Sequence, residues 1–271
     1  IGGNFGLGTG GDGILNVEQG GTLTVSGNGE GNGNIELGFS PRDGKLNIST
    51  GGQVTITNGG QLRVGVSGTG GNDLSEVTLS DAASTLTVDG ITEIATGGRG
   101  QMIVNDGTAN LNGGLRLGGL PNTGSNHRGQ LTQNGGNVNV TGDLIFGGPD
   151  TGREGGVYDL NGGTLTVTGD IVEVTGTDAA QLHLNGGTLN MPNGATTSSI
   201  LVQRFSVAEA TGTNVTYTAN APITTTGTLA VGGFGNAIGD MTIDDAAFPV
   251  NVANAVLGQG GTASGTLTVE G

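Results

Sequence analysis

The sequence predicts an all-β protein, a right-handed parallel β-helix built from three-strand turns. Two observations predict this fold: short segments alternate apolar and polar residues, and glycine-rich corners separate them, recurring at intervals of about 24–31 residues. Alternation with a period of two is typical of strands that bury one face. A repeat of this length fits one turn of a solenoid, and the hand follows from the general preference for right-handed crossovers between parallel strands.

The segment 44–65 shows the repeating unit most clearly. Three short strands are expected there, each with two apolar side chains facing inward: Leu46 and Ile48, Val54 and Ile56, Leu62 and Val64. The corner between the first and second strands recurs along the chain as Gln19-Gly20-Gly21, Thr50-Gly51-Gly52, Asp81-Ala82-Ala83, Asp106-Gly107-Thr108, Asn134-Gly135-Gly136, Asn161-Gly162-Gly163 and Asn185-Gly186-Gly187. Gly, Asn and Asp adopt the tight or positive-φ backbone of such corners at least cost.

Composition agrees with this unit. Glycine contributes 60 of the 271 residues, and hydrophobic residues make up 33%. A strand that buries alternate side chains keeps a core at this low apolar content. We expect a single β-helix domain over 1–271, with an irregular turn or small insertion at about 188–226, where glycine becomes scarce. Neither end carries a recognisable covering helix, so no terminal caps are expected.

Charge and residue counts exclude several classes of function. Lys and Arg number 8 against 23 Asp and Glu, a net charge of −15, and Cys is absent. Because nucleic-acid binding needs a basic surface, no nucleic-acid partner is expected. The absence of Cys excludes disulfides and thiol chemistry. No apolar run reaches the roughly 18 residues that indicate a membrane span, so we expect no membrane insertion.

The repeats resemble those of known bacterial surface proteins. Segments 44–52 (GKLNISTGG) and 162–170 (GGTLTVTGD) resemble the Gly-rich β-strand repeats of autotransporter passengers, filamentous adhesins and PEP-CTERM-type surface proteins. The resemblance covers most of the chain except 188–226. It implies a β-helix that is secreted and extracellular or attached to the cell surface, with an adhesive or structural role and no fixed catalytic motif.

Longer loops are expected at the corner that follows the third strand: 39–43, 66–73, 96–99, 120–128, 149–155, 176–180, 234–240 and 259–264. Solenoids often place function in such loops. The charged residues of these loops form a predicted contact strip for glycans or other surface proteins: Arg42, Asp43, Arg99, Arg128, Asp150, Arg153 and Glu154. A solvated, charge-balanced edge would look the same in sequence, and most surface ion pairs contribute little.

The outward positions of the second strand are rich in Thr and Asn. This predicted Thr/Asn face comprises Thr22, Thr24, Thr55, Thr57, Thr85, Thr87, Thr164 and Thr166, with Thr108, Asn110, Asn137, Asn139, Thr188 and Asn190 in the remaining turns. Its pattern resembles the Thr-x-Thr arrays of ice-binding solenoids. Thr is also a favoured residue on any exposed strand and pairs well with itself, so an ordinary strand surface is the simpler interpretation.

Catalytic and metal-binding chemistry finds little support. His127 and His183 are the only histidines, and each is interpreted as a surface residue. No Ser/His/Asp set or two-His metal spacing can be assembled, and Asp150, Arg153 and Glu154 lack the aromatic platform of a sugar-cleaving site. We therefore predict no enzyme activity and no cofactor. Calcium binding is limited to weak, scattered sites, because no Gly/Asp nonapeptide repeats in tandem.

Both ends of the chain match strands of the repeat rather than caps. Phe5 and Leu7 at one end, and Leu267 and Val269 at the other, are predicted to form an end-to-end interface between copies. A heterologous contact that does not close generates a filament. An excerpt from a longer β-helix would have the same ends.

The predicted function is therefore a secreted structural or adhesive β-solenoid that assembles head-to-tail with itself into an extracellular filament, or forms part of a longer surface fibre. Two alternatives remain open from the sequence. One is a glycan-binding adhesin passenger that uses the contact strip. The other is an ice- or surface-binding protein that uses the Thr/Asn face.

Overall fold

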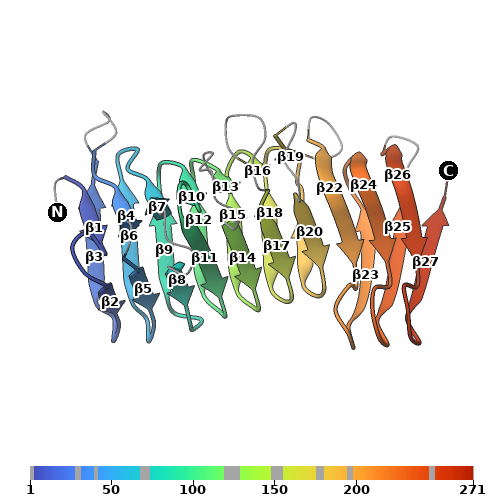
Figure 1. Cartoon of the computed structure of the whole chain (residues 1–271), viewed down its shortest axis with the longest axis horizontal. Coiled ribbons are helices and arrows are strands. Elements are labelled where there is room, and N and C mark those ends of the chain that lie inside the picture. The colour runs from blue at the N-terminus through green and yellow to red at the C-terminus, as the bar shows by residue number, and fades with distance from the viewer. Residues whose placement is uncertain are drawn as a thin grey trace.

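The protein is a rod of stacked parallel β-strands, seen in a computed structural model (Figure 1). The structure describes residues 3–27, 32–39, 42–67, 74–118, 129–147, 155–174, 180–193, 198–243 and 248–270. These residues contain strands and turns but no helix. The N- and C-termini lie at opposite ends of the rod in Figure 1. The predicted all-β solenoid of stacked parallel strands is confirmed.

From residue 5 to residue 190 each coil of the solenoid contributes one strand to each of three faces. The first face holds β2 (Gly13–Val17), β5 (Gly44–Ile48), β8 (Leu74–Leu79), β11 (Arg99–Val104), β14 (Gly129–Gln133), β17 (Val157–Leu160) and β20 (Gln181–Leu184). The second face holds β3 (Thr22–Ser26), β6 (Gln53–Thr57), β9 (Thr85–Val88), β12 (Thr108–Leu111), β15 (Asn137–Val140), β18 (Thr164–Val167) and β21 (Thr188–Asn190). The third face holds β1 (Phe5–Leu7), β4 (Ile35–Phe39), β7 (Leu62–Ser67), β10 (Thr92–Ile94), β13 (Leu115–Leu117), β16 (Leu144–Phe146) and β19 (Ile171–Glu173).

Inward-facing residues stack in straight rows along the rod. In one row of the first face, Leu46 pairs in register with Val77, and the row continues through Met102, Leu131, Tyr158 and Leu182, all with no exposed surface. Alternation along each strand thus builds one continuous core, as the sequence predicts.

One polar pair lies inside this core. The Tyr158 hydroxyl donates to Oε1 of Gln133 at 2.7 Å, and the Gln133 amide donates to the backbone oxygens of Gly136 and Thr164 at 3.2 and 3.0 Å. Burial raises the pKa of Tyr158, so its hydroxyl stays a neutral donor. Both polar side chains are satisfied, which offsets much of the cost of burying them.

The predicted corners between the first and second strands are present, and glycine is required in them by close packing as well as by backbone angle. Gly163 has a φ of 74°, and a Cβ there would lie 2.1 Å from the Gly136 oxygen of the preceding coil. A side chain at Gly163 would therefore force adjacent coils apart.

From residue 200 onward the coil changes shape. β22 (Ile200–Val207) pairs in its first part with β19 and in its second part with β20, so one long strand spans two faces. β24 (Ile223–Val231) and β26 (Val250–Leu257) stack on β22 in the same way, with register irregularities between Val202 and Arg204 and between Thr225 and Thr228. The interval 188–226 is thus built from strands in its described part. Because β22 pairs with strands of both the first and the third face, these two faces form a single 17-stranded sheet.

The second face is interrupted at the same place. β23 (Asn214–Ala219), β25 (Ile238–Ile243) and β27 (Ser264–Val269) form a separate three-stranded sheet, and β23 has no ladder pairing with β21. The corner before β21 is three residues long, 185–187, whereas the corner before β23 runs over 208–213. The longer corner offsets the new sheet from the old one.

The structure corrects two of the predicted loops. Loops 234–240 and 259–264 were expected after a third strand. Residues 234–237 and 259–263 instead lie between β24 and β25 and between β26 and β27, at the corner that precedes the second face, and residues 238–240 and 264 belong to β25 and β27. The long strands have no corner between the third and first faces. Glycine marks either kind of corner, so composition did not distinguish them.

Candidate functional site

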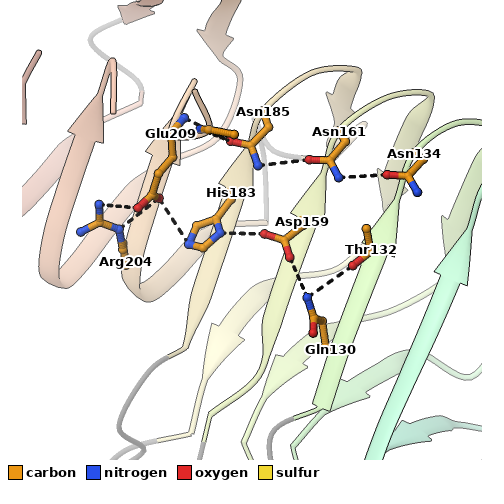
Figure 2. A network of polar contacts seen from close by, with 10 residues as sticks. Gln130, Thr132, Asn134, Asp159, Asn161, His183, Asn185, Arg204 and Glu209 are labelled. Atoms are coloured by element: carbon orange, nitrogen blue, oxygen red, sulfur yellow. Dashed lines mark hydrogen bonds and ion pairs between the residues drawn. The ribbon is translucent and has the colours of Figure 1, made fainter. Parts of the chain in front are cut away.

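The change of coil shape is bridged by polar side chains on the first face, which Figure 2 shows from close by. We call Gln130, Asp159, His183, Arg204 and Glu209 the junction network. They come from β14, β17, β20, β22 and the corner after β22, so four successive coils contribute. The strand register brings these residues together, because His183 pairs with Asp159 on one side and with Ser206 on the other.

His183 lies between two carboxylates. Its Nδ1 is 2.8 Å from Oδ1 of Asp159, and its Nε2 is 3.4 Å from Oε2 of Glu209. Arg204 holds Glu209 through two hydrogen bonds, Nε to Oε2 at 3.2 Å and Nη2 to Oε1 at 2.7 Å. Gln130 donates to the other oxygen of Asp159 at 3.0 Å. The side chains of His183, Asp159, Arg204 and Glu209 are 14–22% exposed, so solvent screens these contacts only in part.

The Glu209 carboxyl is stabilised as an anion. Its partial burial raises its pKa, but the hydrogen bonds from Arg204 and the proximity of His183 outweigh burial, and the pKa lies below its ordinary value. The contacts of Gln130 with Asp159, of Asp159 with His183 and of His183 with Glu209 join each coil to the next.

A second polar row runs along the corner between the first and second faces and also ends at Glu209. In this asparagine ladder, Asn134 donates to Asn105 at 2.9 Å, Asn161 to Asn134 at 3.0 Å, and Asn185 to Asn161 at 3.2 Å. Asn185 Oδ1 then accepts the backbone N–H groups of Glu209 and Ala210, each at 3.1 Å. The ladder thus ties the three-strand coils to the first long-strand coil.

The third face carries a row of alternating charge, which we call the charge ladder. Arg63 Nη1 lies 3.1 Å from Glu36 Oε1, and Arg63 Nε lies 3.3 Å from Glu93 Oε2. Arg116 Nη1 completes the row at 2.7 Å from Glu93 Oε1. These four residues share one register row of β4, β7, β10 and β13.

Sequence reasoning missed both the charge ladder and the junction network. His183 was expected to be a surface residue, whereas it lies half-buried between two acidic partners. Such ladders could be found in a sequence by searching for charged residues at outward strand positions that are one coil apart. This search requires the register of each strand pair, which the loops of variable length conceal.

The predicted contact strip lies largely beyond the described residues: Arg128, Asp150, Arg153 and Glu154 are outside them, as is His127. Arg42 is exposed and Asp43 half-buried just before β5, while half-buried Arg99 begins β11. Register places Arg99 opposite Leu74 of β8. The strip therefore stays a prediction.

The Thr/Asn face is formed by the outward side chains of the second-face strands. One row contains Thr24, Thr55, Thr87, Asn110, Asn139, Thr166 and Asn190. The register differs from the predicted alignment at β6, since Gln53 pairs with Thr22 and Thr57 pairs with Ser26. Asn139 donates to Asn110 at 2.9 Å, so amides in this row bond to each other. Binding of ice or another surface by this face stays a prediction.

The four predicted end-interface residues lie on two different faces. Phe5 and Leu7 are half-buried in β1 on the third face, whereas Leu267 and Val269 belong to β27 of the interrupted second face. Val269 is 71% exposed. Phe5 does not share a row with Leu267 or Val269; its row ends at Val250.

No protein-family model, curated protein or solved structure matches the chain. The structure shows the architecture of the chain, which is a β-solenoid of stacked parallel strands. Within the described ranges, no helix has the length and apolarity to cross a membrane. Across those same residues, no three His, Asp or Glu side chains are grouped to hold a metal ion.

Proposed function

We propose that the chain is a structural rod of an extended extracellular fibre, in which copies stack head-to-tail through the open strand edges of their end coils. The single observation that carries the proposal is the match between the two end coils. Apolar side chains of the inward rows are partly exposed in both: Phe5 and Leu15 in the first coil, Val250 and Leu257 in the last. The extracellular setting is supported by the resemblance of the repeats to those of bacterial surface proteins.

Among the inward rows that run the whole length of the described rod, two end on apolar side chains that are partly exposed. One begins at Phe5 and ends at Val250. The other begins at Val17 and ends at Leu257, which is 49% exposed. A further coil placed on either end would continue these rows with apolar contacts, and burial of apolar surface is the main driving force for association.

The fold itself contains a precedent for joining unlike coils. β22 pairs simultaneously with the two short strands β19 and β20. Long strand β26 of one copy would pair in the same manner with β1 and β2 of the next. Open parallel edges of this kind are ready templates for another chain.

The test is sedimentation velocity over a concentration series with a matched pair of variants. Leu257 and Phe234 are each 49% exposed, but Leu257 ends a core row and Phe234 lies on the side of the rod in the corner after β24. We expect the unmodified chain and Phe234→Asp to form larger species with rising concentration, and Leu257→Asp to stay monomeric. A chain that is a monomer at every concentration would contradict head-to-tail assembly, and so would equal assembly by both variants.

A further inference from the structure

The break in the second face opens a pocket between two strand edges. The pocket has a volume of about 160 Å³. One side is formed by Gly187 and the first two residues of β21, the other side by residues 215–218 of β23, and Leu184 also lines it. The asparagine ladder and the junction network lie around the corner from it, at Asn185 and Glu209. The pocket therefore belongs to the coil at which the solenoid changes shape.

Backbone hydrogen-bonding groups face this pocket. In a parallel sheet, alternate residues of a strand bond to the neighbour on one side and the rest to the neighbour on the other. Thr188 N–H donates to Gly163 of the preceding coil, and Ile238 N–H donates to Thr213, next to β23. By this alternation Leu189 turns its N–H and C=O away from β18, and Thr216 turns its own away from β25. Both sets of groups point into the gap.

The side chains give the pocket an apolar floor and a neutral polar rim. Leu184, Leu189, Val215 and Tyr217 are 2–6% exposed. The hydroxyls of Thr188, Thr216 and Thr218 belong to exposed residues at the mouth. None of the lining residues carries a charge. Burial raises the pKa of Tyr217, so this side chain is neutral as well.

The ends of the gap exclude an inserted peptide strand. At one corner Ala208 N–H donates to the Leu184 oxygen at 2.7 Å, and at the other Ile200 N–H donates to the Pro222 oxygen at 2.8 Å. Adjacent coils thus stay one strand spacing apart on both flanks, whereas an added strand needs a further spacing of about 4.8 Å.

The volume of the pocket matches a ligand that consists of a single ring. A pocket near 160 Å³ is smaller than the roughly 300–1,000 Å³ of sites for drug-sized ligands and close to the cavity of about 150 Å³ that accepts benzene. A hydrocarbon ring would leave the peptide groups of Leu189 and Thr216 without partners, which is costly. A charged ring would meet no opposite charge.

We propose that this pocket binds one neutral sugar ring. Its C–H face would lie on the floor formed by Leu189 and Val215. Its hydroxyls would bond with the open peptide groups of Leu189 and Thr216 and with the threonine hydroxyls of the rim. The proposal concerns the side of the rod and is independent of head-to-tail assembly.

Saturation-transfer NMR with neutral methyl glycosides of glucose, galactose and mannose tests the site, with glucuronate and phenol as competing probes. We expect saturation transfer to at least one neutral glycoside and amide shift changes at Leu189 and Thr216. Val215→Phe fills the floor and Thr216→Val removes a rim hydroxyl, and each is expected to weaken binding at least fivefold. Thr242→Val, on β25 outside the pocket, is the matched control and is expected to bind as the unmodified chain does.

Several results would overturn the proposal: no transfer to any neutral glycoside, binding that Thr216→Val leaves unchanged, or preference for phenol or glucuronate. Thermal unfolding confirms that each variant is folded, and Thr216→Val keeps the test decisive if Val215→Phe does not fold. Because binding is measured on monomer at low concentration, its failure is distinguishable from failure of fibre assembly.

Discussion

The three-strand coils over 5–190 and the long-strand coils over 200–269 solve the same packing problem in different ways. In the first region three short strands per coil each pair with the coil before and after. In the second region one bent strand covers two faces, and the remaining face forms its own sheet. Inward rows of the first and third faces continue from one region into the other. Continuity of the solenoid therefore depends on its apolar rows, while the number of strands in a coil can vary.

At the boundary between the regions, polar side chains join the coils beside the interrupted second face. Between β21 and β23 the second face has no backbone pairing, and at that coil the junction network and the asparagine ladder converge on Glu209. These side chains add cross-coil contacts to the first face and its corner, where the backbone pairing of β20 with β22 is intact. Variants on the two sides of the boundary are therefore expected to differ in which strands they loosen.

Phe205→Ala removes a fully buried ring on the long-strand side of the boundary, where its centroid lies 5.6 Å from that of Tyr217. We expect a loss of about 3–5 kcal/mol, because the cavity cannot collapse in a stacked core. Chemical denaturation measures the loss, and hydrogen exchange should show faster opening of β22, β24 and β26. Phe146→Ala, in the three-strand region, is the matched control and should open β13, β16 and β19 instead.

Glu209→Gln breaks the node of the junction network. Arg204 would lose its ion pair and one of the two acceptor oxygens while remaining only 22% exposed, so we expect destabilisation of about 1–3 kcal/mol. Glu93→Gln, between the two arginines of the charge ladder, is the counterpart in the three-strand region. Hydrogen exchange should show the first variant loosening 198–219 and the second loosening 62–117. Identical exchange patterns would remove the distinction between the regions.

Acid should weaken the junction through the same carboxyl. The pKa of Glu209 is lowered in the folded state, so above the ordinary Glu pKa its charge stabilises the fold. That contribution is lost as the pH falls through the lowered value. Thermal unfolding between pH 6 and pH 3 should therefore show the stability of the unmodified chain approaching that of Glu209→Gln. A constant difference between the two chains over this range would show that Glu209 does not act through its charge.

Asn161→Ala interrupts the asparagine ladder in its middle. It removes hydrogen bonds to Asn134 and from Asn185, and we expect a cost of about 0.5–1.5 kcal/mol. Asn137→Ala, at an exposed second-face position, should change stability by less than about 0.5 kcal/mol. Melting temperatures of the two variants provide the measurement. Equal shifts would mean that the ladder adds nothing to the backbone pairing.

Much of the fold could be predicted from the sequence because alternation and corners are local. Leu46, Val54 and Leu62 show their inward direction within a few residues, and Gly163 marks a corner by its own backbone. The shape of the last coils could not be predicted in this way. Fusion of the third and first strands in β22 leaves glycine-rich segments such as 234–240 in place, while the corner that they occupy changes.

The polar sites were harder to predict for a related reason. Parallel strands pair residues a whole coil apart, and corner length varies by several residues between coils. Thr57 consequently pairs with Ser26 rather than Thr24, and the proximity of His183 to Asp159 and Glu209 follows only from the observed register.

Electron microscopy of the purified chain over a concentration series, with and without calcium, tests the central proposal most directly. We expect unbranched filaments one rod wide, in which strands lie across the filament axis and stack along it at a spacing of about 4.8 Å. We expect Leu257→Asp to lose these filaments. Isolated short rods at every concentration would contradict the proposal.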